Sequence, residues 1–421
     1  MLSEFQYKRI CYYTNWAQYR PGFGKFTPQD VDPFLCTHLV YAYATIDNSM
    51  LKPSEWNDDS TPEMKGMFEQ VNDLKATNPY LKTLLAVGGW NTGTAQMSAM
   101  LKSKDSREMF VRTSITFLRT RNFDGIDLHF EYPGTRGSPS ADKTRFARLC
   151  KELNKAFDKD AMRSGKDRLL LCVSVAAEKK IIGRAYDVDR IIKFVDWVNL
   201  MSYDLHGGWE KKTGLNAPLK ARLSEVLTDR QFNVGWATRY WLQLGCPRRK
   251  LVIGMPAFGR SYKLTSPLSH GVGADVTGGA SAAPYTRETG FYSYYEVCQA
   301  FIYGGGHMVF HKEHRVPYIF KGYEWIGYDD PFSLHLKAQW MKKHHLGGWM
   351  LWALDLDDFS GNFCKEGKFP LLKALNKALG GSVFNTIDVR GSSLLNVNGT
   401  NVLGSLADRG FSSGYSAGAF K

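Results

Sequence analysis

Short runs of β-branched and aromatic residues recur along the chain, and stretches of helical periodicity separate them. Eight of these runs fit strands: residues 10–16, 37–46, 82–90, 125–132, 169–177, 197–204, 251–259 and 347–356. Between them, apolar residues fall three and four positions apart in stretches that fit amphipathic helices: residues 61–77, 106–121, 141–162, 233–244 and 331–344. Strands that alternate with helices in this way predict an α/β fold, the parallel (β/α)8 TIM barrel.

The connection between the seventh and eighth runs is too long for a loop. Residues 261–330 are rich in Gly and Tyr and hold strand-like pieces, so we expect an α+β subdomain inserted between strands 7 and 8 of the barrel. The barrel itself is predicted over residues 7–260 and 331–379. From residue 380 to 421, Gly, Ser and Asn dominate without periodicity, and this tail is expected to lack a fixed structure.

Composition narrows the possible partners. The chain has 421 residues, of which 43% are hydrophobic, but no apolar run approaches the roughly 18 residues of a membrane span. The net charge of +13 raises the question of nucleic acid. The basic residues are scattered rather than clustered with aromatics, which favours a solvated basic surface. We therefore expect no nucleic acid or membrane partner, and a monomer.

The fourth run carries the clearest chemistry. Strand side chains alternate, so Asp127, His129 and Glu131 point to one side and the apolar residues between them to the other. In a barrel strand the polar row then faces the interior and rises to the carboxyl-terminal mouth, where barrel enzymes hold their active sites. The alternative is a polar core layer whose members satisfy one another.

Other predicted strands end in aromatic and polar residues that would share this mouth. They are Tyr12, Trp16, Tyr43, Trp90, Met201, Tyr203, Asp204 and Trp352. A single Trp is most often core packing, but several aromatic rings beside carboxylates favour a sugar-binding cleft, because the faces of sugar rings stack on flat side chains. The seven cysteines form no CxxC pair, and no metal or cofactor is expected.

The ordered motifs of the chain resemble glycoside hydrolase family 18, in particular the animal chitinases and chitinase-like lectins, over about residues 7–379. The segments that carry the resemblance are residues 11–20, 84–91, 124–134, 201–210 and 352–359. The resemblance implies a (β/α)8 barrel with an α+β insertion after strand seven, in agreement with the spacing of the runs. It also implies chitin or chito-oligosaccharides as the partner.

The resemblance further implies a disulfide framework. Cys11 would pair with Cys36 and Cys298 with Cys364, which leaves three thiols: Cys150, Cys172 and Cys246. Disulfides are typical of secreted proteins, so an extracellular location is expected. The first nine residues lack the apolar core of a signal peptide, and we interpret the start as processed or trimmed.

The family motif DxxDxDxE matches at Asp124, Asp127 and Glu131, with Glu131 as the general acid. In this family the substrate's own N-acetyl group attacks the anomeric carbon. Here His129 replaces the aspartate that would orient the acetamide and offset the positive charge of the intermediate. Phe258 stands where active relatives usually carry a tyrosine that helps to hold the same group.

Two further catalytic positions, Tyr203 and Asp204, keep the family residues. The positions that match the family's sugar-binding cleft are Tyr12, Trp16, Tyr19, Tyr43, Trp56, Trp90, Met201, Trp209, Arg260, Glu288 and Trp352. We therefore expect chitin binding with weak or absent hydrolysis. One alternative is an active endochitinase, which the retained Glu131 favours. Another is a scaffold that acts through protein partners without binding sugar, and the retained cleft tryptophans count against it.

Overall fold

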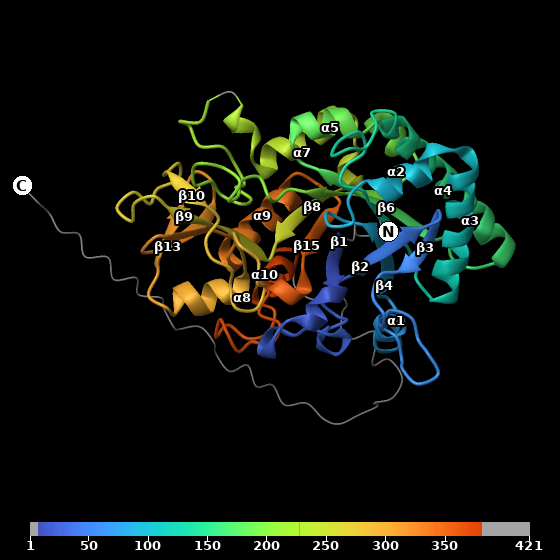
Figure 1. Cartoon of the computed structure of the whole chain (residues 1–421), viewed down its shortest axis with the longest axis horizontal. Coiled ribbons are helices and arrows are strands. Elements are labelled where there is room, and N and C mark those ends of the chain that lie inside the picture. The colour runs from blue at the N-terminus through green and yellow to red at the C-terminus, as the bar shows by residue number, and fades with distance from the viewer. Residues whose placement is uncertain (1–6, 227, 381–421) are drawn as a thin grey trace, which may run out of the picture. The chain divides into compact units, whose positions relative to one another are not determined.

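Eight parallel strands close into a barrel in the computed structural model, which describes residues 7–226 and 228–380 (Figure 1). Their order around the barrel is β1-β15-β8-β7-β6-β5-β4-β2, and β2 pairs with β1 to close it. The strands are β1 (Lys8–Thr14), β2 (His38–Asp47), β4 (Lys82–Gly88), β5 (Gly125–His129), β6 (Leu170–Ala176), β7 (Trp197–Met201), β8 (Leu251–Pro256) and β15 (Gly348–Trp352). The (β/α)8 barrel predicted from periodicity is confirmed. Residues 381–421, nearly all of the predicted tail, lie outside the described residues.

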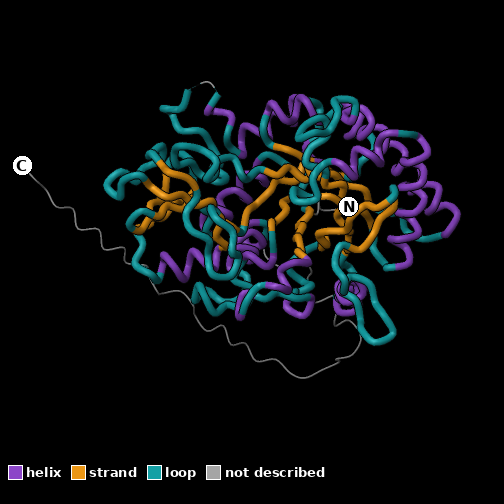
Figure 2. The backbone as a smooth tube through the Cα atoms, viewed as in Figure 1, coloured by secondary structure: helices purple, strands orange, loops and turns teal. Residues whose placement is uncertain are grey.

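Helices surround the barrel strands, as the tube in Figure 2 shows. They are α1 (Met67–Thr77), α2 (Ala95–Lys102), α3 (Lys104–Thr120), α4 (Asp142–Ser164), α5 (Lys179–Ala185), α6 (Val188–Ile191), α7 (Val234–Gln243), α9 (Pro331–Lys343) and α10 (Pro370–Ala378). In α4, Phe146, Leu153 and Phe157 are buried on one face, and burial of each stabilises the fold by about 1.5–3 kcal/mol. Within the described residues, no helix is both long and apolar enough to cross a membrane.

A second, six-stranded sheet lies between β8 and α9 in the chain. Its strands are β9 (Phe258–Leu264), β10 (Val276–Gly278), β11 (Phe291–Ser293), β12 (His307–His311), β13 (Val316–Lys321) and β14 (Glu324–Gly327), with the short helix α8 (Tyr294–Val297) after β11. Tyr262, Val316 and Trp325 belong to a small hydrophobic core of this sheet. The domain boundaries proposed from the sequence, residues 261 and 330, stay a prediction.

Two strand assignments differ from the expectation. The run 251–259, predicted as one strand, divides at Ala257, whose N–H donates to the Trp352 carbonyl oxygen at 2.8 Å. Phe258 and Arg260 therefore lie on β9 of the second sheet. A short strand that was not predicted, β3 (Met50–Pro53), pairs antiparallel with the end of β2.

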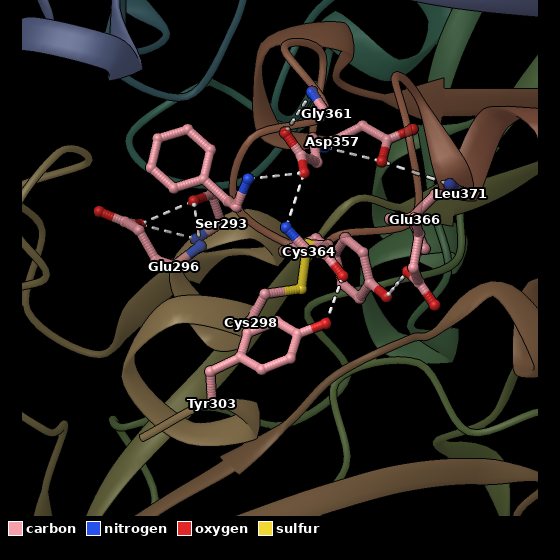
Figure 3. Close-up of a disulfide and its surroundings, with 12 residues drawn as sticks. Ser293, Glu296, Cys298, Tyr303, Asp357, Gly361, Cys364, Glu366 and Leu371 are labelled. Carbon is pink, nitrogen blue, oxygen red and sulfur yellow. Dashed lines mark hydrogen bonds between the residues drawn. A yellow bond between two sulfur atoms is a disulfide. The ribbon is translucent and has the colours of Figure 1, made fainter.

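The two disulfides of the structure are Cys11–Cys36 and Cys298–Cys364, the pairs that the resemblance implied. Figure 3 shows the second, where the Tyr303 hydroxyl donates to the Cys364 carbonyl oxygen. The Asp358 carboxylate accepts the Cys364 N–H at 2.7 Å. The three remaining cysteines, Cys150, Cys172 and Cys246, are unpaired and buried.

Replacing both Cys298 and Cys364 with Ala should lower the free energy of unfolding by about 2–4 kcal/mol, because the disulfide closes a long loop and restricts the unfolded chain. The two residues are 66 positions apart. Urea unfolding of the oxidised proteins, followed by tryptophan fluorescence, measures the difference. A loss below about 1 kcal/mol would contradict the expectation.

Candidate active site in a cleft at the barrel mouth

A cleft of about 1120 Å³ opens where the barrel strands end. The barrel contributes Tyr43 from β2, His129 from β5, Met201 from β7 and Trp352 from β15. Ten further predicted site residues line the same cleft: Trp16, Tyr19, Trp90, Glu131, Tyr203, Asp204, Trp209, Phe258, Arg260 and Glu288. The structure thus brings together most of the residues that the sequence singled out.

Asp127 lies below the cleft floor, in the barrel interior. Its carboxylate is fully buried and accepts hydrogen bonds from the Tyr12 hydroxyl at 2.8 Å and the Ser174 hydroxyl at 2.9 Å. Asn199 Nδ2 donates to the Tyr12 hydroxyl at 3.0 Å. The sequence analysis did not single out Ser174 and Asn199, although each is a polar residue within an apolar strand run. Such buried polar groups must find partners, and here they hold a carboxylate.

His129 sits between two carboxylates. Its Nε2 lies 3.3 Å from Glu131 Oε1, and its Nδ1 lies 3.5 Å from Asp127 Oδ2. Within the described residues Nδ1 has no aligned hydrogen-bond acceptor, so its attraction to Asp127 is between charges. Burial by itself lowers the pKa of His129, but the contacts with Asp127 and Glu131 outweigh it and raise the pKa to about 9. The two carboxylates therefore favour the protonated imidazole.

Glu131 follows β5 directly and reaches into the cleft. Its side chain is 11% exposed, so one edge of the carboxylate is open to a ligand while His129 faces the other. Beside it the wall is aromatic: the Tyr203 ring meets the Phe258 ring edge-on at 5.7 Å, and Phe258 stacks on Phe291 at 4.7 Å. Because Phe258 has no hydroxyl, this part of the wall offers no hydrogen bond from that position.

Three aromatic residues form the centre of the cleft. Trp16 stacks near Tyr43 with a ring-centre distance of 5.8 Å, and Tyr43 lies 6.0 Å from Trp352. Trp352 is also 5.9 Å from the His129 ring. The half-buried Trp352 is therefore held by neighbouring rings at the floor, next to the charged row.

The rim of the cleft is more exposed. Trp90 and Trp209 are 56% and 63% exposed, which leaves large flat surfaces open to a ligand. Arg260 Nε donates to Asp204 Oδ1 at 2.7 Å, and Arg260 also lies 3.5 Å from Glu288 and over the Trp209 ring. This arrangement fixes polar groups beside an aromatic platform, as recognition of a sugar requires.

Four predicted site residues do not line this cleft: Tyr12 and Asp127, which are buried in the barrel interior, and Asp124 and Trp56. Asp124 precedes β5 at its amino-terminal end, where its carboxylate accepts the Thr83 N–H at 2.7 Å and pairs with Lys75 at 3.1 Å. A strand rises about 3.3 Å per residue, which places Asp124 roughly 16 Å from His129 and outside the cleft. Trp56 is 73% exposed and does not line the cleft either. The assignment of Asp124 and Trp56 to the site stays a prediction.

A closed parallel barrel with carboxylates at the end of one strand and a cleft lined by indole rings has the architecture of a carbohydrate-active barrel. The sequence profile of glycosyl hydrolases family 18 matches residues 8–357. The chain belongs to this family.

Several known proteins are similar to it. Chitotriosidase-1 of Mus musculus is 44% identical over 372 residues, which cover 88% of this chain and 78% of that relative. An immunomodulatory active chitinase of Trichuris suis superimposes with a TM-score of 0.85 at 38% identity, covering 89% of this chain and 100% of that one. Human YKL-39, described as a pseudo-chitinase with retained chitooligosaccharide binding properties, superimposes with a TM-score of 0.84 at 40% identity and the same coverage.

The raised pKa of His129 predicts a pH-dependent stability. The folded protein holds the proton more tightly than the unfolded chain, where the histidine pKa is near 6.5. The stabilisation is thus complete below about pH 6.5 and is lost as the pH rises through about 9. Urea unfolding of the native protein and of His129→Gln between pH 6 and 10 measures it: the difference in unfolding free energy should shrink with rising pH. Parallel pH profiles would rule out a protonated His129.

Proposed function

We propose that this protein binds chito-oligosaccharides in the cleft and hydrolyses them weakly or not at all. The observation that carries the proposal is the position of His129 between Asp127 and Glu131, where the two carboxylates raise its pKa. The cleft keeps the aromatic surfaces on which sugar rings can stack, whereas His129 replaces the aspartate of the family motif beneath them.

The family reaction makes two demands on this row. The acetamide must be oriented for attack, and the positive intermediate that forms must be stabilised by negative charge. An imidazolium at position 129 has no lone pair to accept the acetamide N–H, and its charge opposes the intermediate. Its Nε2 also lies 3.3 Å from Glu131 Oε1, an oxygen of the carboxyl group that would have to give a proton to the leaving oxygen.

The loss should be large. Removing one preorganised hydrogen bond to a transition state commonly costs about 2.7–4 kcal/mol, or roughly 100- to 1000-fold in rate. The missing hydroxyl at Phe258 adds to this loss. The affinity for the sugar should be affected much less than the rate, because stacking on Trp90, Trp209 and Trp352 needs no charge at position 129.

Two related properties belong to the same proposal. The similarity to YKL-39, which is described as binding chitooligosaccharides, supports sugar as the ligand. The two disulfides support an extracellular location, because disulfides persist in oxidising compartments.

A second candidate is an active endochitinase. The observation that favours it is Glu131, which is present at the end of β5 and partly open to the cleft. In this reading a ligand would have to displace His129 from Glu131. Rate measurements separate the two candidates.

Affinity should rise with ligand length from about three to six sugars, because stacking surfaces follow one another along the cleft. Replacing Trp352 with Ala should weaken hexamer binding by more than about tenfold. A matched control is Trp340→Ala, since Trp340 on α9 packs against His344, which follows the helix, and does not line the cleft. Titration calorimetry decides the matter: equal affinity for dimer and hexamer, or equal effects of the two substitutions, would contradict the proposal.

An aspartate at position 129 should increase the rate of hydrolysis. We expect His129→Asp to raise chitin-hexamer hydrolysis at least about tenfold, and Phe258→Tyr to raise it further, with gains that do not add because both residues would hold one acetamide. Hexamer affinity should change less than the rate, because these groups act on the transition state. Product release over days, followed by chromatography, measures the rate.

Two variants control this experiment. His129→Asn removes the positive charge without adding a negative one, and should give a smaller gain than the aspartate. Glu131→Gln in the rescued double variant should abolish the gain, since the leaving oxygen then has no proton donor. Turnover by the unmodified protein at about 1 per second or faster would instead establish the endochitinase.

A further inference from the structure

Arg136 makes three contacts that join the two sides of the cleft rim. Its guanidinium lies flat against the Trp90 indole, with its central carbon 3.4 Å from the ring centre. Its Nη1 donates to the Glu131 carbonyl oxygen at 2.9 Å, and its Nη2 donates to the Trp90 carbonyl oxygen at 3.2 Å. One side chain thus connects the loop after β4 with the segment that carries Glu131.

The backbone of Arg136 has an unusual conformation that neighbouring residues stabilise. Its φ is +50°, a left-handed conformation that a residue with a side chain adopts only when the surroundings impose it. The Arg136 carbonyl oxygen accepts a hydrogen bond from the Thr94 hydroxyl at 2.9 Å, across to the Trp90 side. The same turn is closed by Ser138, whose N–H donates to the Thr135 carbonyl oxygen at 2.8 Å.

Trp90 depends on such support. Its indole is 56% exposed, and it follows Gly88 and Gly89, both with positive φ, at +113° and +86°. A flat ring on an exposed loop loses rotational freedom when a sugar stacks on it, and this loss weakens binding unless the ring is already fixed. Arg136 covers one face of the indole and leaves the other face for a ligand.

We propose that Arg136 is a positioning residue that fixes Trp90 as a stacking platform in register with Glu131. The inference rests on the proposed function, because the ligand is taken to be a chito-oligosaccharide. We assign the effect of Arg136 to Trp90 rather than to direct contact with the sugar, because its guanidinium lies over the indole and two of its N–H groups donate to backbone oxygens. It therefore sets how firmly a long oligosaccharide is held across the rim.

The test combines binding and NMR on the full chain. Arg136→Ala should weaken chitin-hexamer binding five- to tenfold, while Trp90→Ala should weaken it at least as much. The double variant should bind no more weakly than Trp90→Ala, because Arg136 then has nothing left to position. Arg136→Lys should recover only part of the affinity, since it keeps the charge but loses the flat, two-pronged contact.

Arg121→Ala is the matched control. Arg121 also stacks on a ring, 3.6 Å from the Phe117 centre, and pairs with Asp59, but it lies outside the cleft. Its removal should leave hexamer affinity unchanged. Without sugar, the indole ¹⁵N resonance of Trp90 should show increased mobility in Arg136→Ala and none in Arg121→Ala.

The outcomes are distinct. An unchanged Trp90 resonance, or losses of affinity that add in the double variant, would overturn the positioning role. If Trp90 becomes mobile in Arg136→Ala while the unmodified protein fails to bind the hexamer, the positioning role is supported and the proposed function is refuted.

Discussion

The contact of His129 with Asp127 and Glu131 governs the site. Three ionisable groups lie together at the end of β5, where Asp127 and His129 are almost fully buried, and buried charges are costly unless each has a partner. Here that partner is His129, whose pKa the two carboxylates raise. The two carboxylates are thereby satisfied before any ligand arrives, and the rest of the floor is built around this arrangement, with Tyr12 and Ser174 holding Asp127 from below. Under the proposed function, His129 thus stands where hydrolysis would need a negative charge.

The residues of the cleft rim come from other elements than the residues of the floor, and other interactions hold them in place. Trp90, Trp209 and Arg260 come from loops and from the second sheet, and their contacts are stacking contacts and ion pairs near the surface. None of these contacts involves His129. Under the proposed function, sugar recognition at the rim therefore does not depend on the charged residues of the floor.

Much of the barrel fold could be predicted from the sequence, because its strands appear as short apolar runs and its helices as amphipathic stretches. The alternation of Asp127, His129 and Glu131 located the floor. Prediction failed where the signal is not periodic. The break at Ala257 is accompanied by hydrogen bonds to β15 and α8, which are distant in the sequence, and β3 is too short to give a recognisable pattern. Asp124 matched a motif, yet a motif does not reveal which end of a strand faces the cleft. Partners such as Asn199 become visible only when the barrel is closed.

The direct passage from β8 into β9 has a mechanical consequence. Only Ala257 lies between them, and it is fastened on both sides: its N–H bonds the Trp352 carbonyl and its carbonyl oxygen accepts the Tyr294 N–H at 3.0 Å. These two hydrogen bonds restrict backbone motion at the junction between the barrel and the second sheet. An oligosaccharide of the proposed kind would therefore adjust its own glycosidic torsions to this edge of the cleft, and chains that already favour the required shape would lose the least freedom on binding.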